Sequence, residues 1–552
     1  MSASILMIVA LASLAAGYVV YGRYLANRYG LDPHRPTPAH TRRDGVDYVP
    51  AKVPVLMGHH FASIAGAAPI IGPVVAATFG WVPVLLWILI GSIFMGGVHD
   101  FSALVASVRH GGGTMGEVIE EYVGRTGKRL FLVFAWSLVV LVISVFAHSV
   151  SNVFVKAPAT ASSSFLFIVI ALAFGLSVYR LKAPLWVSSI VGVALIGGCI
   201  AMGLKFPCEL PADTWKVILF VYVFFASVTP VWILLQPRDY LCSFLLCAVI
   251  IAGVIGIFAA NPQIQSPSLT AFSPEGVGAM FPILFVTVAC GAISGFHSLV
   301  SAGTTAKQLD RETDARPVAY GSMLVEGLLA VMALITATAI TRGQYSQFMG
   351  EGGGGAIAVF STGLGTFLAK LGISQQAGTT FAALAISAFA LTTLDTATRL
   401  GRFMFQEFFE EAGKKTFLST NRYVGTLVTI VAAAALTFTG SRATLWPLFG
   451  SANQLLASLT FLAITVWLTR LGRTSTFIKI PMVFMFCVTI TALAFLVHKN
   501  LRDRNYVLVV MAMLLLGVAV TLVTRAWASL VGTPASAPQD HEERLHEQTQ
   551  NI

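Results

Sequence analysis

Long apolar segments constrain this chain more than any other feature of its sequence. About fifteen stretches are near 20 residues long and almost free of charge, the length that an α-helix needs to cross a bilayer. They begin near residues 4, 54, 81, 130, 163, 184, 216, 239, 280, 317, 377, 421, 446, 478 and 505. Backbone groups in lipid must bond within their own segment, so such segments form helices. The sequence therefore predicts an all-α polytopic membrane protein with about fifteen transmembrane helices.

The charge content excludes an ordinary soluble fold. Only 11% of the residues are charged, against roughly 25% in soluble domains. The net charge of +10 lies in short connections such as residues 23–52 and 399–422, which is typical of cytoplasmic loops and not of a nucleic-acid surface. This pattern predicts an N-terminus outside and a C-terminus in the cytoplasm, although residues 499–504 depart from it. The polar tail, residues 531–552, is predicted to be disordered.

The six cysteines indicate no metal or redox centre. None forms a CxxC pair, and five lie in or at the end of apolar segments, so we interpret them as small buried hydrophobes. The sequence also lacks HExxH and GxSxG motifs, and we expect neither a cofactor nor enzymatic activity. An intramembrane enzyme with a metal held by His59, His60, His99 and Asp100 is one alternative.

The second apolar segment is the most interrupted one. Small residues surround Gly66, and Pro69 and Pro73 follow it. Proline removes a backbone donor and clashes with the preceding turn, so we expect the helix to unwind near residues 65–69. Free backbone groups there would face a cavity. A tightly packed, kinked helix is the alternative interpretation.

The seventh segment has a matching interruption that ends in Thr229 and Pro230. It comes five segments after the second, so the two interrupted helices would run in opposite directions, as an inverted five-helix repeat requires. This predicts repeats at residues 54–204 and 216–400. A first helix with a basic loop, residues 1–53, would precede them, and additional helices, residues 401–530, would follow.

Ionisable and hydroxyl side chains lie in several other segments, where they are costly and favour a function. Ser298, Ser301 and Thr305 share a helical face, where hydroxyls can coordinate a cation or bond back to an earlier carbonyl. Asp395 and Arg399 have the i,i+4 spacing of an intrahelical ion pair. A further set could relay protons: His59, His60, Asp100, His297, Glu326 and Asp395.

The chain resembles the carbon starvation protein CstA family of bacterial inner-membrane transporters over roughly residues 50–470. The matching blocks are GHHF at 58–61 through Pro73, GVHDF at 97–101 with ASVR at 106–109, LQPRDYL at 235–241, SGFH at 294–297 to Thr305, LDTATR at 394–399, and LWPLFG at 445–450 with ANQ at 452–454. Several ordered blocks of this kind make a more specific signal than any single short motif.

The resemblance implies uptake of short peptides or pyruvate during carbon starvation, coupled to protons in preference to sodium. It also implies a LeuT-like five-plus-five inverted-repeat core of the amino acid–polyamine–organocation superfamily, with extra helices. Substrate would then bind at the two interruptions, through Gly58, His59, His60, Ser63, Gly66, Thr229 and Pro230. Ser298, Ser301, Thr304 and Thr305 would form a cation-like site, and Asp100, His297 or Asp395 would carry the proton. The remaining alternative is a membrane nutrient sensor without transport.

Overall fold

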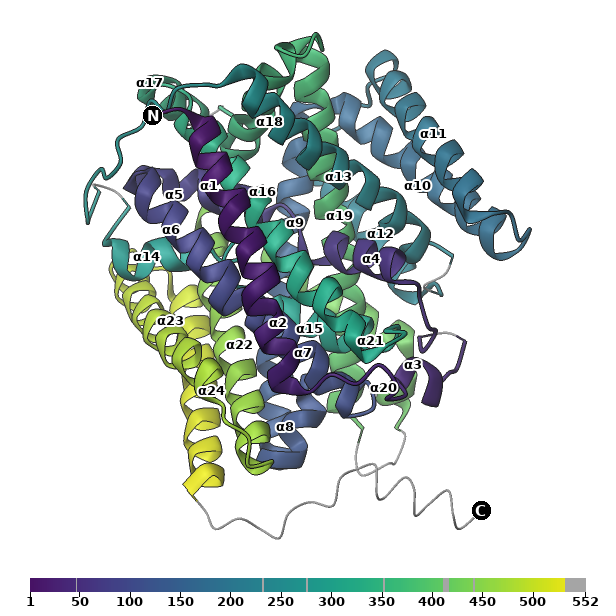
Figure 1. The fold of residues 1–552 in the computed structure, drawn as a ribbon, viewed down its shortest axis with the longest axis vertical. Coiled ribbons are helices and arrows are strands. Elements are labelled where there is room, and N and C mark those ends of the chain that lie inside the picture. Colours follow the sequence, from purple (N-terminus) through teal and green to yellow (C-terminus); the bar gives the residue numbers. More distant parts are fainter. Residues whose placement is uncertain are drawn as a thin grey trace.

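The computed structural model describes residues 1–45, 47–230, 233–274, 277–350, 353–410, 416–439 and 442–531. The predicted disordered tail lies, beyond Val531, outside the described residues. Within the described residues every regular element is a helix, apart from two isolated β-bridges. The N-terminus and α17 (Arg342–Met349) lie at one end of the long axis, and α3 (Pro38–Thr41), α8 (Met115–Val123) and α20 (Phe417–Thr420) lie toward the other (Figure 1).

Twelve helical stretches of the described chain are long and apolar enough to cross a membrane, and one bent pair brings the total to thirteen. They are α1–α2 (Ala3–Ala16 and Gly22–Tyr29), α6–α7 (Trp81–Gly91 and Gly97–Arg109), α9 (Arg125–Lys156), α10 (Pro158–Tyr179), α11 (Leu185–Lys205), α13 (Leu235–Ala260), α16 (Ser322–Thr338), α19 (Gln375–Phe408), α21 (Arg422–Thr439), α22 (Arg442–Arg470), α23 (Thr476–Arg502) and α24 (Tyr506–Val531), with the bent pair α4–α5 (Val53–Ile64 and Ala68–Ala76). A further apolar helix, α18 (Gly355–Ala369), is too short to span.

The predicted number of fifteen spans is not confirmed by this criterion, which finds twelve or thirteen among the described residues. All fifteen predicted segments contain a helix, but two of them are not continuous spans of sufficient length. The segment near residue 216 is α12 (Ala212–Val228), which has 17 residues. The segment near residue 280 is divided into α14 (Met280–Thr287) and α15 (Gly295–Val300).

The first interrupted helix is α4–α5, which bends by 47°. The chain unwinds after Ile64 and becomes helical again at Ala68, within the stretch that Gly66 and Pro69 predict. Pro69 lies in the first turn of α5, where its missing N–H leaves no bond unmade. A Cβ on Gly66 would lie 2.6 Å from Thr393 Oγ1, so glycine allows α19 to approach the break closely.

A second interrupted helix, α14–α15, is one that the sequence did not predict. Residues 288–294 between its two halves are not helical, and a π-helical turn at Ser301–Thr305 continues α15. The side chain of Asn453 in α22 accepts the Phe296 amide at 2.8 Å, which satisfies a free donor at the start of α15. A Cβ on Gly72 of α5 would lie 2.6 Å from the Thr287 carbonyl oxygen, so the two interrupted helices are in direct contact.

The interruption predicted at Thr229 and Pro230 does not break a helix. α12 ends at Val228, and these residues begin the connection to α13. Proline commonly follows the end of a helix, because it cannot continue one. The predicted interruption is therefore the end of α12 and not a break inside a helix.

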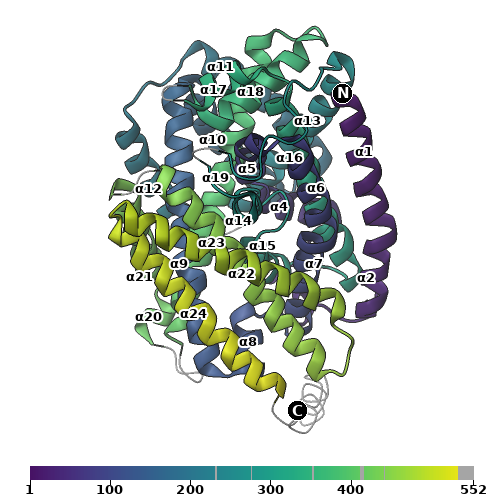
Figure 2. The same cartoon turned by 90° about the vertical axis from the view of Figure 1, so that its left-hand side faces the viewer.

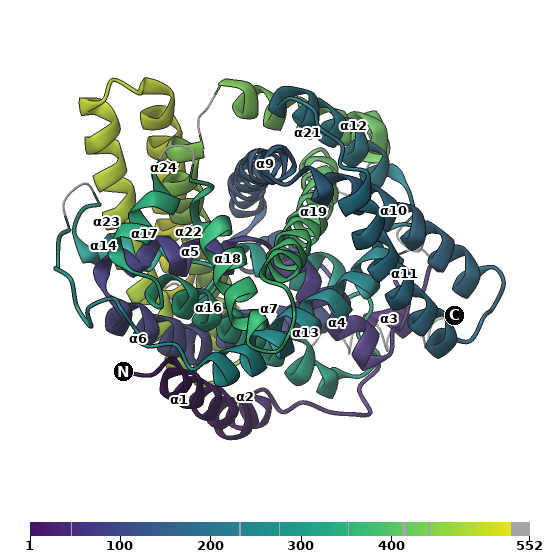
Figure 3. The ribbon, with the colours of Figure 1, turned by 90° about the horizontal axis from the view of Figure 1, so that it is seen from above.

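The long helices α9 and α19 lie side by side through the middle of the molecule (Figure 3). α12 and α21 pack against both of them. α13 packs on α4 and α19, and α22 packs in the same manner on α15 and α9. The hairpin α10–α11 lies at one edge, and α23–α24 lies on the far side of the central helices (Figures 1 and 2).

The basic first loop is held against the end of the molecule where α8 lies. Glu312, which is fully buried, accepts the Asp32 amide at 2.8 Å, Arg109 Nε at 2.8 Å and Arg35 Nη1 at 3.3 Å. Charge-assisted bonds of this kind are stronger than neutral ones, so Glu312 ties this loop to α7.

Candidate functional site

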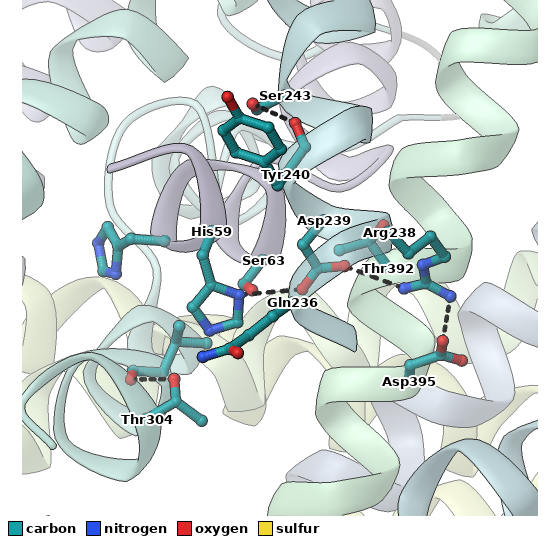
Figure 4. A network of polar contacts seen from close by, with 12 residues as sticks. His59, Ser63, Gln236, Arg238, Asp239, Tyr240, Ser243, Thr304, Thr392 and Asp395 are labelled. Carbon is teal, nitrogen blue, oxygen red and sulfur yellow. Dashed lines mark hydrogen bonds and ion pairs between the residues drawn. The ribbon is translucent and has the colours of Figure 1, made fainter. Parts of the chain in front are cut away.

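A chain of buried charged side chains links α4, α13 and α19 (Figure 4). His59 Nδ1 lies 3.0 Å from Asp239 Oδ2, and Asp239 Oδ1 lies 3.2 Å from Arg238 Nη2. Arg238 Nη1 donates to Asp395 Oδ2, which also accepts the Tyr222 hydroxyl at 2.7 Å. The side chains of His59, Arg238 and the two aspartates are at most 4% exposed. Each charge in this network therefore depends on its partners, because a lone buried charge is very costly.

Arg399 does not pair with Asp395 as their spacing predicted. Its Nη2 donates to Ala226 O at 3.0 Å and to Thr229 O, and Arg402 bonds to the same end of α12. These carbonyls belong to the C-terminus of a helix, where cations are favourable. The Nε of Arg399 has no acceptor among the described residues, and this donor is buried.

A small cavity lies at the His59 end of this network, and a larger cavity borders the small one. The smaller one, of about 20 Å³, lies between α4, α13, α19 and the segment after α15. Its polar lining is Asp47, His59, Gln236, Thr304, Lys307, Gln308, Thr396 and Arg399. The larger one, of about 240 Å³, lies between α8, α9 and α19 and shares Gly303, Lys307 and Phe403 with the smaller. A space of 20 Å³ holds about one water, so the smaller cavity is nearly closed in this conformation.

A second buried cluster joins α7, α15 and α16. Asp100 Oδ1 lies 2.9 Å from His99 Nδ1, and Asp100 Oδ2 lies 2.8 Å from His297 Nδ1. His297 Nε2 lies 3.4 Å from Glu326 Oε2, and all four side chains are fully buried. The fold thus gathers three of the predicted proton-relay residues, but Asp395 belongs to the other network.

The predicted substrate residues of α4 point to different neighbours. His59 lines the smaller cavity, whereas His60 Nδ1 lies 2.8 Å from Thr305 Oγ1. Gly58 faces Ser243 of α13 at close range, and the Ser63 carbonyl accepts Thr393 Oγ1 at 3.4 Å. Ser63 and Gly66 therefore both meet Thr393, one turn of α19 from the cavity residue Thr396.

The predicted hydroxyl face is mostly engaged in bonds to protein. Ser298 Oγ donates to the Gly295 carbonyl at 2.7 Å and lies 3.0 Å from Thr460 Oγ1. Thr304 Oγ1 donates to the Val300 carbonyl at 2.9 Å, which is the back-bonding alternative. Ser301 Oγ is buried and has no partner among the described residues.

Three residues of the first network, Arg238, Asp239 and Tyr222, are not among the site residues that the sequence predicted. A signal was present, because the pair Arg238–Asp239 stands at the start of an apolar segment, inside one of the blocks that carry the family resemblance. The basic residue was instead assigned to a cytoplasmic connection. The histidines of the enzyme alternative do not converge: His59, His60 and His99 each bond to a different partner.

A family model described as "Carbon starvation protein CstA" matches residues 2–354 and 348–492. The protein named "Peptide transporter CstA" of Campylobacter jejuni is 34% identical over 559 residues, which cover 89% of this chain and 79% of that protein. "Pyruvate/proton symporter BtsT" of Escherichia coli is 34% identical over 552 residues, which cover 83% of this chain and 76% of that protein. These relatives are named as transporters and not as enzymes.

Solved structures resemble this fold at low sequence identity. A manganese transporter of Eremococcus coleocola aligns with a TM-score of 0.51 and 12% identity, covering 88% of this chain and 99% of that one. This likeness concerns the fold alone. With the apolar helices, it supports a multi-pass membrane protein of transporter fold.

Proposed function

Because the chain belongs to the carbon starvation protein CstA family, we propose that it is a secondary transporter that takes up a small carboxylate-bearing nutrient by proton-coupled alternating access. Short peptides and pyruvate are the proposed substrates, and the names of the relatives support both. We place the protein in the bacterial inner membrane, with the N-terminus outside, and we propose that it acts during carbon starvation. The single observation that carries the proposal is the buried charge network that ends at a cavity beside a broken helix.

We infer a LeuT-like inverted repeat with α4–α5 and α14–α15 as its two broken helices. The packing supports this pairing, since α13 contacts α4 and α19 as α22 contacts α15 and α9. Both halves also have a long central helix, α9 or α19, preceded by shorter helices, α8 or α17–α18. The repeats would then cover residues 53–260 and 280–470, with the hairpin α10–α11 inserted in the first. We propose these boundaries in place of residues 54–204 and 216–400, which were expected because Pro230 was taken as the second interruption.

The proposed substrate site is the smaller cavity. Two cations, Arg399 and Lys307, line it beside one carboxylate, Asp47, and Arg399 has a buried Nε donor without an acceptor among the described residues. A guanidinium binds carboxylates through paired donors, so it suits a substrate with a carboxylate group. Of the predicted residues, His59 and Thr304 would contact the substrate, while Gly66 keeps α4–α5 broken beside it. Substrate would enter through the larger cavity after α4 and α19 separate.

The proposed proton carrier is Asp395. When it takes up a proton, its negative charge no longer holds Arg238, which keeps Asp239 as its charged partner and Tyr222 as a neutral one. If Arg238 then shifts toward Asp239, it competes with His59 for the Asp239 carboxylate. His59 lines the cavity, so a change in its hydrogen bond reaches the cavity. Proton binding on α19 thus changes the polar lining that the substrate meets. Asp100 and His297 stay predicted carriers in the second cluster.

Substituting Asp395 by Asn separates coupling from substrate binding. We expect Asp395→Asn to lose proton-driven accumulation in proteoliposomes while it keeps substrate exchange at equal pH, because exchange needs no net proton movement. Asp213→Asn, at an exposed aspartate paired with Lys216, is the matched control and should retain both activities. Full proton-driven accumulation by Asp395→Asn would remove this residue from the mechanism. The same test applies to Asp100→Asn and His297→Gln.

A further inference from the structure

Three potential metal ligands meet where α14–α15 is broken. Cys290 lies in the non-helical residues of the break, His297 lies on α15 and Glu326 lies on α16. The sulfur, the ring nitrogen and the carboxylate oxygen lie within 4.8 Å of one another. Among the described residues, this is the one group of Cys, His and carboxylate side chains close enough to hold a metal ion.

Two of the three ligand groups, His297 Nε2 and the Glu326 carboxylate, lack hydrogen bonds among the described residues, whereas Cys290 Sγ donates to Ser294 Oγ at 3.5 Å. Asp100 Oδ2 lies 2.8 Å from His297 Nδ1, so an ionised Asp100 holds the ring proton on Nδ1 and leaves a lone pair on Nε2. That lone pair lies 3.4 Å from a Glu326 oxygen, and in the described part of the chain neither Glu326 oxygen nor His297 Nε2 has a hydrogen-bond partner. Two buried acceptors facing each other are unfavourable unless a proton or a metal ion lies between them.

The ligand types select the kind of cation. Thiolate, imidazole and carboxylate together are typical of zinc-class ions, whereas sodium, magnesium and calcium prefer oxygen alone. Ligands about 2.05 Å from a tetrahedral zinc ion lie roughly 3.4 Å apart, the separation observed between His297 and Glu326. Cys290 needs a shift of about 1 Å to complete the set, because the three atoms spread over as much as 4.8 Å.

The surrounding groups support the ligands as an outer shell. A metal-binding histidine normally donates its other nitrogen to a carboxylate, and Asp100 takes that position for His297. Asn453 Nδ2 lies 3.7 Å from the Cys290 sulfur and points a donor at it, which favours the thiolate form that binds metal. These contacts come from α7 and α22, so the site is built from four parts of the fold.

We propose that Cys290, His297 and Glu326 bind one zinc-class divalent ion, with Asp100 as the residue that orients His297. No short sequence motif predicts this site, because only the fold brings Glu326 close to Cys290 and His297. The ion would tie the break in α14–α15 to α16. If the proposed function is correct, zinc would then slow uptake, because the broken helix could not change its conformation.

Direct metal binding tests the site without reference to transport. Purified, chelator-treated protein in detergent would be titrated with Zn²⁺ by calorimetry and with Co²⁺ by absorption spectroscopy. We expect one ion per chain and a thiolate-to-cobalt charge-transfer band. Cys290→Ser should abolish the band, and Glu326→Gln should weaken zinc binding at least tenfold. Cys487→Ser, at an exposed cysteine of α23, is the matched control and should change neither result.

Two outcomes would overturn the proposal. The first is a folded, monodisperse wild-type protein that binds neither ion, which would mean that a proton alone separates His297 from Glu326. The second is binding that Cys290→Ser and Glu326→Gln both leave intact. The cobalt spectrum of the wild type decides the matter even if a variant does not fold. Binding needs neither substrate nor a proton gradient, so its failure leaves the transport proposal untouched.

Discussion

The buried network of Arg238 predicts a large difference between one substitution and two. Arg238→Met leaves Asp395 and Asp239, both fully buried, without their cation. Removing one partner of a buried ion pair costs about 3–5 kcal/mol of folding stability. The double variant Arg238→Met with Asp395→Leu removes both charges, and Asp239 keeps its bond to His59. Its stability should recover part of this loss, because apolar replacement of a buried pair is near neutral or stabilising, although Asp239 is left without Arg238.

The free energy of unfolding, measured by titration with denaturing detergent in mixed micelles, tests this cycle. The pair Lys216–Asp213, whose aspartate is 77% exposed, is the control, and its removal should cost at most about 1 kcal/mol. Both Arg238 variants should also lose proton-driven uptake, because the double variant restores the fold and not the carrier. A loss below 1 kcal/mol in Arg238→Met, or a double variant no more stable than the single one, would refute this reasoning.

Three further predictions concern the cavity, the contact between the broken helices and the first loop. Arg399→Met should raise the half-saturating concentration of a carboxylate substrate by about 10–100-fold, measured from initial uptake rates. This corresponds to the loss of one charged hydrogen bond of roughly 1.5–3 kcal/mol. Gly72→Ala places a Cβ against the backbone of α14 and should abolish uptake, whereas Gly198→Ala, which meets no atom within 4 Å, should retain it. Glu312→Ala frees the basic first loop, so trypsin should cleave after Arg42 faster than in the wild type without loss of the membrane core.

The apolar segments predicted the helices well because lipid dictates them directly. All fifteen segments contain helix, and the first break occurs where Gly66 and Pro69 indicated it. The second break was missed because residues 288–294 contain no proline and few polar side chains. Side chains distant in sequence stabilise the break: Trp87 donates to the Val288 carbonyl, and Asn453 accepts the Phe296 amide just after it. No local pattern reveals these contacts.

The candidate site was predicted only in part, for a similar reason. His59, Asp100 and Asp395 were selected because they are ionisable residues in apolar segments, and each lies in a buried network. Which residue pairs with which was not accessible, since Asp395 and Arg238 are 157 positions apart. The i,i+4 spacing favoured Arg399 instead, but the open C-terminus of α12 competes for that guanidinium.

Uptake into proteoliposomes that contain only the purified chain tests the central claim most directly. Radiolabelled pyruvate and a dipeptide would each be offered with an imposed inward proton gradient and, separately, with a sodium gradient. The account predicts accumulation of one of them that follows the proton gradient and collapses when a protonophore is added. Absence of uptake under either gradient, with binding of the same ligands intact, would contradict it and favour a sensor.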